Sequence, residues 1–359
     1  VSTQSTGIDS FKDAANQKMI NQEIKKRLVR FDQIIPVFFK MADGGEGTMD
    51  ALCDEYIEIN TVDALFRPIK QKLGVFNDYI VVEMAQSSGL ELIEAEKRNP
   101  VETSTYGFGL AMLEALKYSK KLILTVGGSA TCDCGLGMIE ALGATFEANG
   151  QRIPNVTPKK LMGVSGLNID VSKLLENQAI DEILVLSDVQ YKLTGVRGSA
   201  HVFAPQKGAS YDQVLKLDNF LVGVSDYFGF PENASDGAAG GIVYLLRNLL
   251  KATVKSGAAF ILQEQKFQEH DFKYLITGEG KFDDQTLFGK AVYQACSMFD
   301  GVKIGVFGQI VGDWRQLLDS AFCVQKGCYT LEEGLDRAVE CIGDTVESII
   351  ALIEAAQTK

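Results

Sequence analysis

Three short apolar segments set the fold class: Tyr274-Leu-Ile-Thr277, Val302-Lys-Ile-Gly-Val-Phe307 and Ala321-Phe-Cys-Val324. Each has the length and composition of a buried strand, and each is followed by a segment with helical character. The helix-like segments cover 286–299, 314–320 and 331–356. Strands that alternate with helices in this way predict a parallel sheet with helices on both faces.

The N-terminal part repeats the alternation on a smaller scale. A helix is expected at 14–30, a strand at 34–39, and a helix at 48–56 with Thr48 as its N-cap. This unit is too small to bury its own sheet, so we expect it to join the C-terminal part. The predicted fold is α/β with two domains. A discontinuous, Rossmann-like, doubly wound parallel-sheet domain takes residues 1–58 plus 268–359, and a mixed α/β domain (59–267) is inserted, with the active site in the cleft between them.

The inserted part starts in a different pattern. Alternating segments at 57–62 and 78–84 flank a turn-like segment at 72–78, which is typical of an antiparallel hairpin. Strands are expected further on at 121–126 and 181–187, and helices at 135–142 and 235–256.

Three loops combine glycine with carboxylates. They read Met41-Ala-Asp-Gly-Gly-Glu-Gly-Thr48, Gly127-Gly-Ser-Ala-Thr-Cys-Asp-Cys-Gly135 and Thr277-Gly-Glu-Gly-Lys-Phe-Asp-Asp-Gln-Thr286. Glycine lets backbone amides approach an anion closely, and a helix that starts below the loop favours negative charge. Carboxylates would repel a phosphate unless a cation lies between them, and Mg²⁺ is held by carboxylates together with substrate phosphates. The loops therefore predict Mg²⁺ and nucleotide chemistry.

Bulk properties exclude several classes of protein. The net charge is −12, from 47 acidic and 35 basic residues, which argues against a general nucleic-acid surface. No apolar run reaches the length of about 18 residues that a membrane span needs, and the first twenty residues do not resemble a signal peptide. The seven cysteines show no disulfide pattern. We expect a cytoplasmic protein with no membrane partner.

Tests for widespread motifs fail. The residues around Gly289-Lys290 lack the first glycine and the final Ser/Thr of a phosphate-binding P-loop, and no dinucleotide fingerprint is present, which argues against a nicotinamide dehydrogenase. Only two histidines occur, so neither a histidine-based zinc site nor a histidine triad can be built. Cys132 and Cys134 are expected to be buried packing residues.

Seven blocks carry a family resemblance. They are Asp9-Ser-Phe-Lys12, Met41 to Thr48, Glu83-Met-Ala85 with Ser88-Gly-Leu90, Gly127-Gly-Ser-Ala-Thr131, Phe203-Ala-Pro-Gln-Lys-Gly-Ala209, Gly237-Ala-Ala-Gly-Gly241, and Ile276-Thr-Gly-Glu-Gly280 with Gln285 and Gly289-Lys290. In this order they resemble the bacterial type I glycerate kinase family, over most of the chain. The resemblance implies two α/β domains and phosphorylation of D-glycerate by ATP, usually to 2-phosphoglycerate. Glycerate and ATP are then the expected partners, and the choice between monomer and homodimer stays open.

Residues within or near these blocks are the candidates for the chemistry of phosphoryl transfer, which is mainly positioning and charge neutralisation. The expected catalytic residues are Asp188, Lys207 and Lys290, and the expected substrate-binding residues are Asp9, Ser10, Lys12, Asp43, Gly44, Gly45, Ser129 and Thr131. Nucleotide or phosphate binding is expected from Gly127, Gly128, Gly278, Gly280, Gln285 and Thr286, and metal binding from Asp133, Glu279 and Asp283. Structural roles remain alternatives for several of them, such as hydrogen bonds from Glu279 to loop amides, or capping by Ser129 and Thr131.

The sequence departs from the family pattern at four places: the polar first strand at 2–8, Cys132 and Cys134 in the second loop, Tyr191 and Lys192 after Asp188, and Ser235-Asp236. Three of these lie in expected site loops. A kinase for another small hydroxy acid and a catalytically weak ligand-binding relative therefore remain alternatives.

Overall fold

The chain divides into two compact units, Val1–Ala42 with Ala258–Lys359, and Asp43–Gly257. The computed structural model describes residues 2–8, 17–32, 34–176, 179–287, 291–324, 327 and 330–357. Residues 43–58, which the sequence pattern placed in the discontinuous domain, belong to the second unit. The reason is that strand β3 (Glu55–Val62) pairs along its whole length with β4 (Pro68–Phe76).

The first unit contains one parallel sheet in the order β14-β13-β12-β1-β2. Its strands are β1 (Ser2–Ile8), β2 (Ile34–Phe38), β12 (Tyr274–Phe282), β13 (Val302–Ile310) and β14 (Ser320–Cys323). Its helices are α1 (Gln17–Leu28), α11 (Asp284–Leu287), α12 (Ala291–Ser297), α13 (Leu331–Asp336) and α14 (Ala338–Gln357), with short 3-10 turns at η5 (Phe267–Glu269) and η6 (Trp314–Gln316). Helix α10 (Gly257–Glu264) leads into this unit.

Helices cover both faces of this sheet, because neighbouring strand residues point to opposite sides. Ile276 packs with Ile20 of α1 and Ile342 of α14, whereas the adjacent Leu275 packs with Val292 of α12 in a separate core. The doubly wound architecture predicted from the C-terminal alternation is therefore confirmed. The polar segment 2–8 is nevertheless the strand between β12 and β2, where its backbone pairs on both sides.

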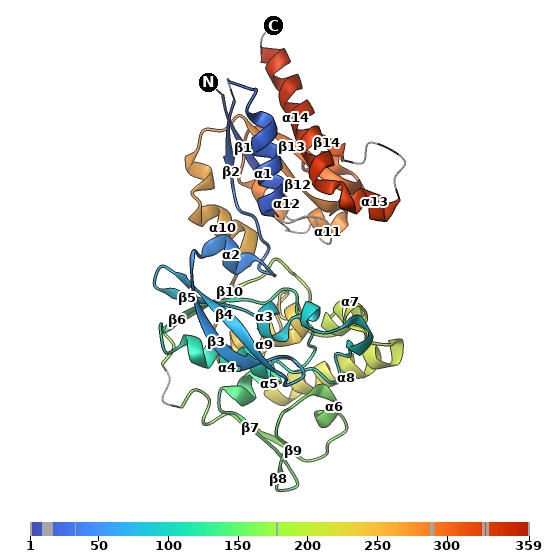
Figure 1. Cartoon of the computed structure of the whole chain (residues 1–359). Coiled ribbons are helices and arrows are strands. Elements are labelled where there is room, and N and C mark those ends of the chain that lie inside the picture. Colours follow the sequence, from blue (N-terminus) through green and yellow to red (C-terminus); the bar gives the residue numbers. More distant parts are fainter. Residues whose placement is uncertain are drawn as a thin grey trace. The chain divides into compact units, whose positions relative to one another are not determined.

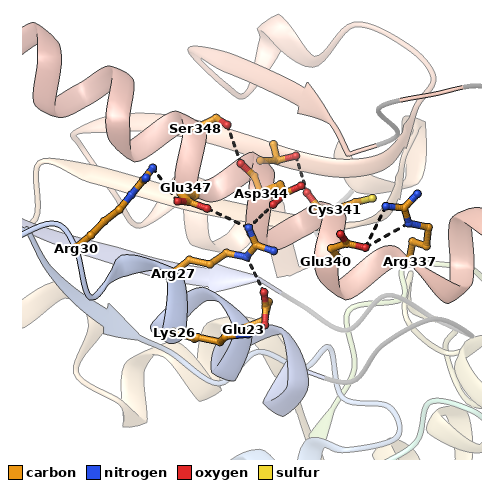
Figure 2. A network of polar contacts seen from close by, with 11 residues as sticks. Glu23, Lys26, Arg27, Arg30, Arg337, Glu340, Cys341, Asp344, Glu347 and Ser348 are labelled. Carbon is orange, nitrogen blue, oxygen red and sulfur yellow. Dashed lines mark hydrogen bonds and ion pairs between the residues drawn. The ribbon is translucent and has the colours of Figure 1, made fainter.

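Helices α1 and α14 lie side by side, and one arginine joins them (Figure 1). Arg27 donates to Glu23 at 2.6 Å within α1 and, across the gap, to Glu347 at 3.0 Å and to Asp344 (Figure 2). The Arg27 side chain is only 20% exposed, so solvent screens these ion pairs less than ordinary surface pairs.

Replacing Arg27 with alanine should therefore lower the free energy of unfolding by about 1–2 kcal/mol, because three carboxylates would lose their shared cation and Glu347 would keep only the more exposed Arg30, at 2.7 Å. Urea denaturation measures the effect. Lys26→Ala is the matched control: Lys26 is 79% exposed and reaches Glu23 only at 3.8 Å. Equal stabilities of the two variants would contradict a role of Arg27 in joining the helices.

The second unit contains a six-stranded sheet in the order β11-β10-β6-β5-β4-β3 and a small antiparallel sheet β8-β7-β9. Besides β3 and β4, its strands are β5 (Tyr79–Glu83), β6 (Lys121–Thr125), β7 (Thr145–Ala148), β8 (Gln151–Arg152), β9 (Leu167–Asp170), β10 (Glu182–Leu186) and β11 (Thr253–Lys255). Its helices are α2 (Thr48–Leu52), α3 (Ala85–Ser88), α4 (Tyr106–Ala115), α5 (Leu136–Ala141), α6 (Pro158–Leu161), α7 (Ser199–Phe203), α8 (Tyr211–Phe228) and α9 (Ile242–Leu249), with 3-10 turns η1 (Leu90–Leu92), η2 (Ala95–Lys97), η3 (Pro205–Lys207) and η4 (Ala238–Gly241). Strands β5, β6, β10 and β11 are parallel, and β3 and β4 extend the sheet antiparallel (Figure 1).

Several predicted elements were wrong in detail. The turn-like segment 72–78 is mostly strand β4, and the reversal is the left-handed Asn77 with its neighbour Asp78. The helix expected to run to residue 256 ends at Leu249, so that 253–255 can add a parallel edge strand to β10. The helix expected at 314–320 is only a 3-10 turn. No helix among the described residues combines the length and apolar character that crossing a membrane requires.

Candidate functional site

The parallel strands of the second unit end together. Register places Glu83, Thr125 and Leu186 in one row across β5, β6 and β10. The segments after these residues therefore leave the sheet at one edge, which we call the carboxyl edge. In open α/β sheets this edge is where ligands bind.

The first glycine loop lies against the carboxyl edge. The Gly127 amide at the end of β6 donates to the Gly44 carbonyl at 3.0 Å. Gly44 has φ +86°, and a Cβ there would lie 2.4 Å from the Leu186 carbonyl oxygen. Only glycine satisfies both conditions, since a side chain would clash as well as strain the backbone. The Asp43 carboxylate, which is exposed, accepts from the Gly45 amide at 3.1 Å.

The second glycine loop carries a buried cation at its centre. The Lys207 ammonium donates to the Ser129 hydroxyl at 2.8 Å and to the Thr131 carbonyl at 2.7 Å, and the residue is 3% exposed. Within the described ranges, no carboxylate forms an ion pair with Lys207. Burial lowers the pKa of Lys207 to about 8, although the charges of Cys132 and Asp133 act in the opposite direction. An ammonium has three N–H donors, so one remains for a ligand.

Buried hydroxyls occur in α3, at the end of β6 and in the second glycine loop. The side-chain oxygens of Ser87, Ser88, Thr125 and Thr131 have no hydrogen-bond partner among the described groups. The Ala130 amide donates to the Ser88 carbonyl at 2.8 Å, which fixes the end of α3 against the second loop. Buried polar groups are normally satisfied, so these hydroxyls indicate a site for a polar ligand.

Asp188 follows the same edge. It lies two residues after Leu186, the end of β10, and is half-buried. The Ser187 amide donates to the Lys255 carbonyl at 3.0 Å, which holds the segment against β11. The second unit contains nine of the predicted site residues, which are Asp43, Gly44, Gly45, Gly127, Gly128, Ser129, Thr131, Asp188 and Lys207.

Asp133 does not have the surroundings of a metal ligand. It is 1% exposed, and its oxygens accept from the Thr105 amide and hydroxyl, both at 2.8 Å, and from the amides of Gly137 and Gly135 at 3.1 and 3.2 Å. Burial raises the pKa of Asp133, and these hydrogen bonds oppose the shift. The protein itself occupies the carboxylate, so we take Asp133 as the residue that shapes the second loop.

The third predicted loop is largely strand. Gly278, Glu279 and Gly280 lie inside β12, and Gly278 is buried so closely against β13 that a Cβ would lie 1.8 Å from the Val306 carbonyl. The prediction that Gly278 and Gly280 lie in a loop was therefore wrong. The turn comes later, where the Thr286 hydroxyl donates to Glu279 at 2.5 Å and accepts from the Asp283 amide at 3.1 Å.

The remaining candidates divide as follows. Gln285 lies in α11, and its side chain is outside the described residues, as are Asp9, Ser10, Lys12 and Lys290 altogether. Within the part of the chain that is described, no three His, Cys, Asp or Glu side chains form a group suited to a metal ion. A cavity of about 850 Å³ lies elsewhere in the second unit, beside Leu161, Phe220 and Tyr227, and no predicted site residue lines it.

Comparisons with known proteins identify the family. A sequence model described as the glycerate kinase family matches residues 6–354. The chain is 33% identical to the glycerate kinase of Bacillus subtilis (strain 168), covering 98% of this chain and 97% of the relative. It is 32% identical to the glycerate 2-kinase of Escherichia coli (strain K12), covering 96% of each. The crystal structure of a putative glycerate kinase 2 from Salmonella typhimurium LT2 superposes with a TM-score of 0.81 at 27% identity, covering 100% of both chains. This chain belongs to the glycerate kinase family.

Proposed function

We propose that this chain is an ATP-dependent kinase that phosphorylates D-glycerate, with 2-phosphoglycerate as the product and Mg²⁺ assisting the transfer. The observation that carries the proposal is Lys207, a buried ammonium with no carboxylate partner among the described residues. Burying a cation without a counter-ion is costly, so such a site is suited to an anionic ligand. Glycerate, with a carboxylate and two hydroxyls, matches one cation that contacts the Ser129 hydroxyl and the Thr131 carbonyl.

The catalytic roles follow from position. Lys207 and Ser129 bind and orient the anion, and the Thr131 hydroxyl supplies a further polar contact. Asp188 at the carboxyl edge orients the attacking hydroxyl of the substrate. Because the proton of this hydroxyl leaves late in a loose transition state, a carboxylate is a sufficient base. The amides of the first two loops surround the phosphate, where glycine allows close approach.

Glu279 and Asp283 are the proposed magnesium ligands. The Thr286 hydroxyl donates to the Glu279 carboxylate in β12 and accepts from the Asp283 amide, which links this part of the strand to the turn that follows it. The Asp283 carboxylate also pairs with Lys281 at 3.3 Å. Two carboxylates fit an ion that takes its other ligands from nucleotide phosphates and water, as Mg²⁺ does. When bound, Mg²⁺ would neutralise phosphate charge.

A kinase for another small hydroxy acid is the second candidate, and the residues after Asp188 favour keeping it. The Tyr191 ring packs edge-on against Phe203 at 5.2 Å, and Lys192 is exposed three residues before an exposed turn at Gly195–Arg197. The departures from the family pattern at Cys132 and Cys134 are weaker evidence for an altered substrate, because both side chains are buried. Cys134 is fully buried, and its thiol donates to the Gly241 carbonyl at 3.5 Å.

The test is a coupled assay of ADP release with ATP, Mg²⁺ and a panel of small hydroxy acids, with the product identified by phosphorus NMR. ADP release that requires D-glycerate and yields 2-phosphoglycerate supports the proposal. Release with a different hydroxy acid supports the second candidate. Thermal stabilisation by glycerate without turnover would instead indicate a ligand-binding relative.

A cytoplasmic location is also proposed. The six cysteines that the structure describes are free thiols, and the five buried ones include Cys132 and Cys134, whose pKa values are raised by burial. Such thiols are inert packing groups typical of a reducing compartment.

A further inference from the structure

One buried carboxylate at the carboxyl edge has no role in the reaction proposed above. Glu83, the last residue of β5, is 3% exposed. Its carboxylate accepts from the Met49 amide at 3.0 Å and, more weakly, from the Gly47 amide at 3.4 Å. These amides belong to the N-cap and the first turn of α2, where the first glycine loop ends.

Helix α2 lacks a cap of its own. Thr48, expected as the N-cap, is the first helical residue, and its hydroxyl has no hydrogen-bond partner among the described groups. The N-cap is Gly47, in the left-handed conformation at φ +82°, with no side chain to accept a bond. The first amides of a helix need acceptors, and a carboxylate there also interacts favourably with the helix dipole. Glu83 supplies this cap from another strand.

Glu83 itself is held firmly. The Gln71 side chain, which is 2% exposed, donates to the Glu83 carbonyl at 3.1 Å. On the other side, α2 packs closely on β4, where a Cβ at Gly74 would lie 2.7 Å from Met49. The Glu83 backbone and α2 are therefore both held against β4, which keeps the carboxylate beside the first amides of the helix.

The other end of the loop contacts the site. Gly44 accepts from Gly127 and lies against Leu186, two residues before Asp188. The loop is thus fixed at one end by the backbone of β6 and β10, and at the other by Glu83.

We propose that ionised Glu83 is the positioning residue of the first glycine loop, holding Asp43–Gly45 in place at the carboxyl edge, and that protonation of Glu83 loosens the loop. A charged acceptor holds an amide more strongly than a neutral one. Only the kinetic test of this inference rests on the proposed function, because the state of the loop can be measured by hydrogen exchange without turnover.

The charges around Glu83 set the pH at which this occurs. Burial raises the pKa of Glu83 to about 7; the Met49 and Gly47 amides oppose the shift, and the charges of Asp50 and Glu46 add to it. Neighbouring β4 presents the neutral Gln71, and Thr125 is the register partner in β6. The carboxylate should therefore become protonated as the pH falls through neutral values, which weakens its hydrogen bonds with the Gly47 and Met49 amides.

Glu83→Gln imitates the protonated form, which makes the kinetic test specific. Relative to wild type, kcat/KM for D-glycerate should fall about tenfold at pH 8 but only about twofold at pH 6, where the wild-type carboxyl is itself mostly protonated. Taking the ratio at each pH cancels the titration of other groups such as Lys207. A ratio that stays constant between pH 5.5 and 8.5 would reduce Glu83 to a structural residue and overturn the proposal.

Two further variants sharpen the result. Asp50→Asn removes a negative charge that raises the pKa of Glu83. In this variant, kcat/KM should therefore begin to decline at a lower pH than in the wild-type protein. Glu182→Gln is the matched control: Glu182 is a half-buried strand glutamate at the opposite edge, where it accepts from the Tyr79 hydroxyl at 2.6 Å. Its pH profile should equal that of wild type.

Hydrogen exchange tests the loop directly in the unmodified protein. After correction for intrinsic rates, protection of the Gly47 and Met49 amides should fall about five- to tenfold between pH 8 and pH 6, as a charge-assisted bond becomes a neutral one. Unchanged protection would contradict the proposal even if the kinetics agree. If the protein does not phosphorylate glycerate at all, the proposed function fails while this measurement still decides the role of Glu83.

Discussion

Replacing Lys207 with methionine should lower kcat/KM for D-glycerate about a thousandfold. Methionine keeps most of the buried volume and removes the charge that would bind the anion. The loss should arise from interactions with a charged ligand in a dry site, where charge-assisted hydrogen bonds are strong. Steady-state kinetics with both substrates varied provides the measurement.

Stability should respond in the opposite direction. Lys207 is a buried cation without a carboxylate partner among the described residues, so its removal relieves a desolvation cost while leaving the Ser129 hydroxyl and Thr131 carbonyl short of a donor. We expect the free energy of unfolding of the ligand-free protein to be unchanged or raised by up to about 2 kcal/mol. Lys216→Met, at an exposed lysine of α8, is the control and should change neither quantity. If the Lys207→Met variant keeps kcat/KM within tenfold of the wild-type value, Lys207 does not bind the substrate.

The pH dependence gives an independent check on Lys207. Its pKa is lowered to about 8, so the charged form that binds an anion is present below pH 8 and is lost as the pH rises through that value. The kcat/KM profile, which reports the free enzyme, should therefore decline above pH 8. The kcat profile should decline only at higher pH, because a bound anion favours the ammonium form. A flat profile to pH 10 would contradict the assignment.

Much of the fold follows from local pattern because its central strands are short, continuous and apolar. Segments such as Leu122–Leu124 and Ile183–Leu186 are buried on both faces, so composition alone marks them as strands. Strand β4 was missed because it contains two lysines and Gly74, which together resemble a turn. The glycine is needed there because α2 packs closely on it. Strand β12 was cut short at Thr277 because glycines usually end a strand, whereas here Gly278 allows close packing of β13.

Candidate site residues can be picked out of the sequence where they are loop residues, and not where their surroundings depend on contacts between distant segments. Gly44 and Lys207 stand out in sequence as a glycine and a lysine within unusual loops. Asp133 also stands out in the sequence, as a carboxylate in a glycine loop. Its carboxylate, however, accepts hydrogen bonds from Thr105, a residue 28 positions away that the local sequence does not reveal. Glu83 gave only a weak signal, as a carboxylate at a strand end within one of the resembling blocks. Its role depends on α2, which reaches it through tertiary packing.

Asp188→Asn should lower kcat about a thousandfold while KM for D-glycerate stays within about threefold. Asparagine keeps the shape and can still contact the attacking hydroxyl, but it cannot take its proton or align it by charge, and acid–base groups typically contribute factors of about 10² to 10⁴. The carboxylate follows β10 at the edge where Gly44 meets Leu186, so its backbone position should survive the substitution.

Asp226→Asn, at an exposed aspartate of α8, is the matched control for loss of a charge from the same unit and should retain wild-type kinetics. Binding of glycerate to Asp188→Asn, followed by calorimetry, separates the roles. Retained affinity with slow turnover assigns Asp188 to the chemical step. Lost affinity with normal kcat at saturation would make it a substrate-binding residue, and another carboxylate, with Asp43 the first to test, would have to orient the hydroxyl.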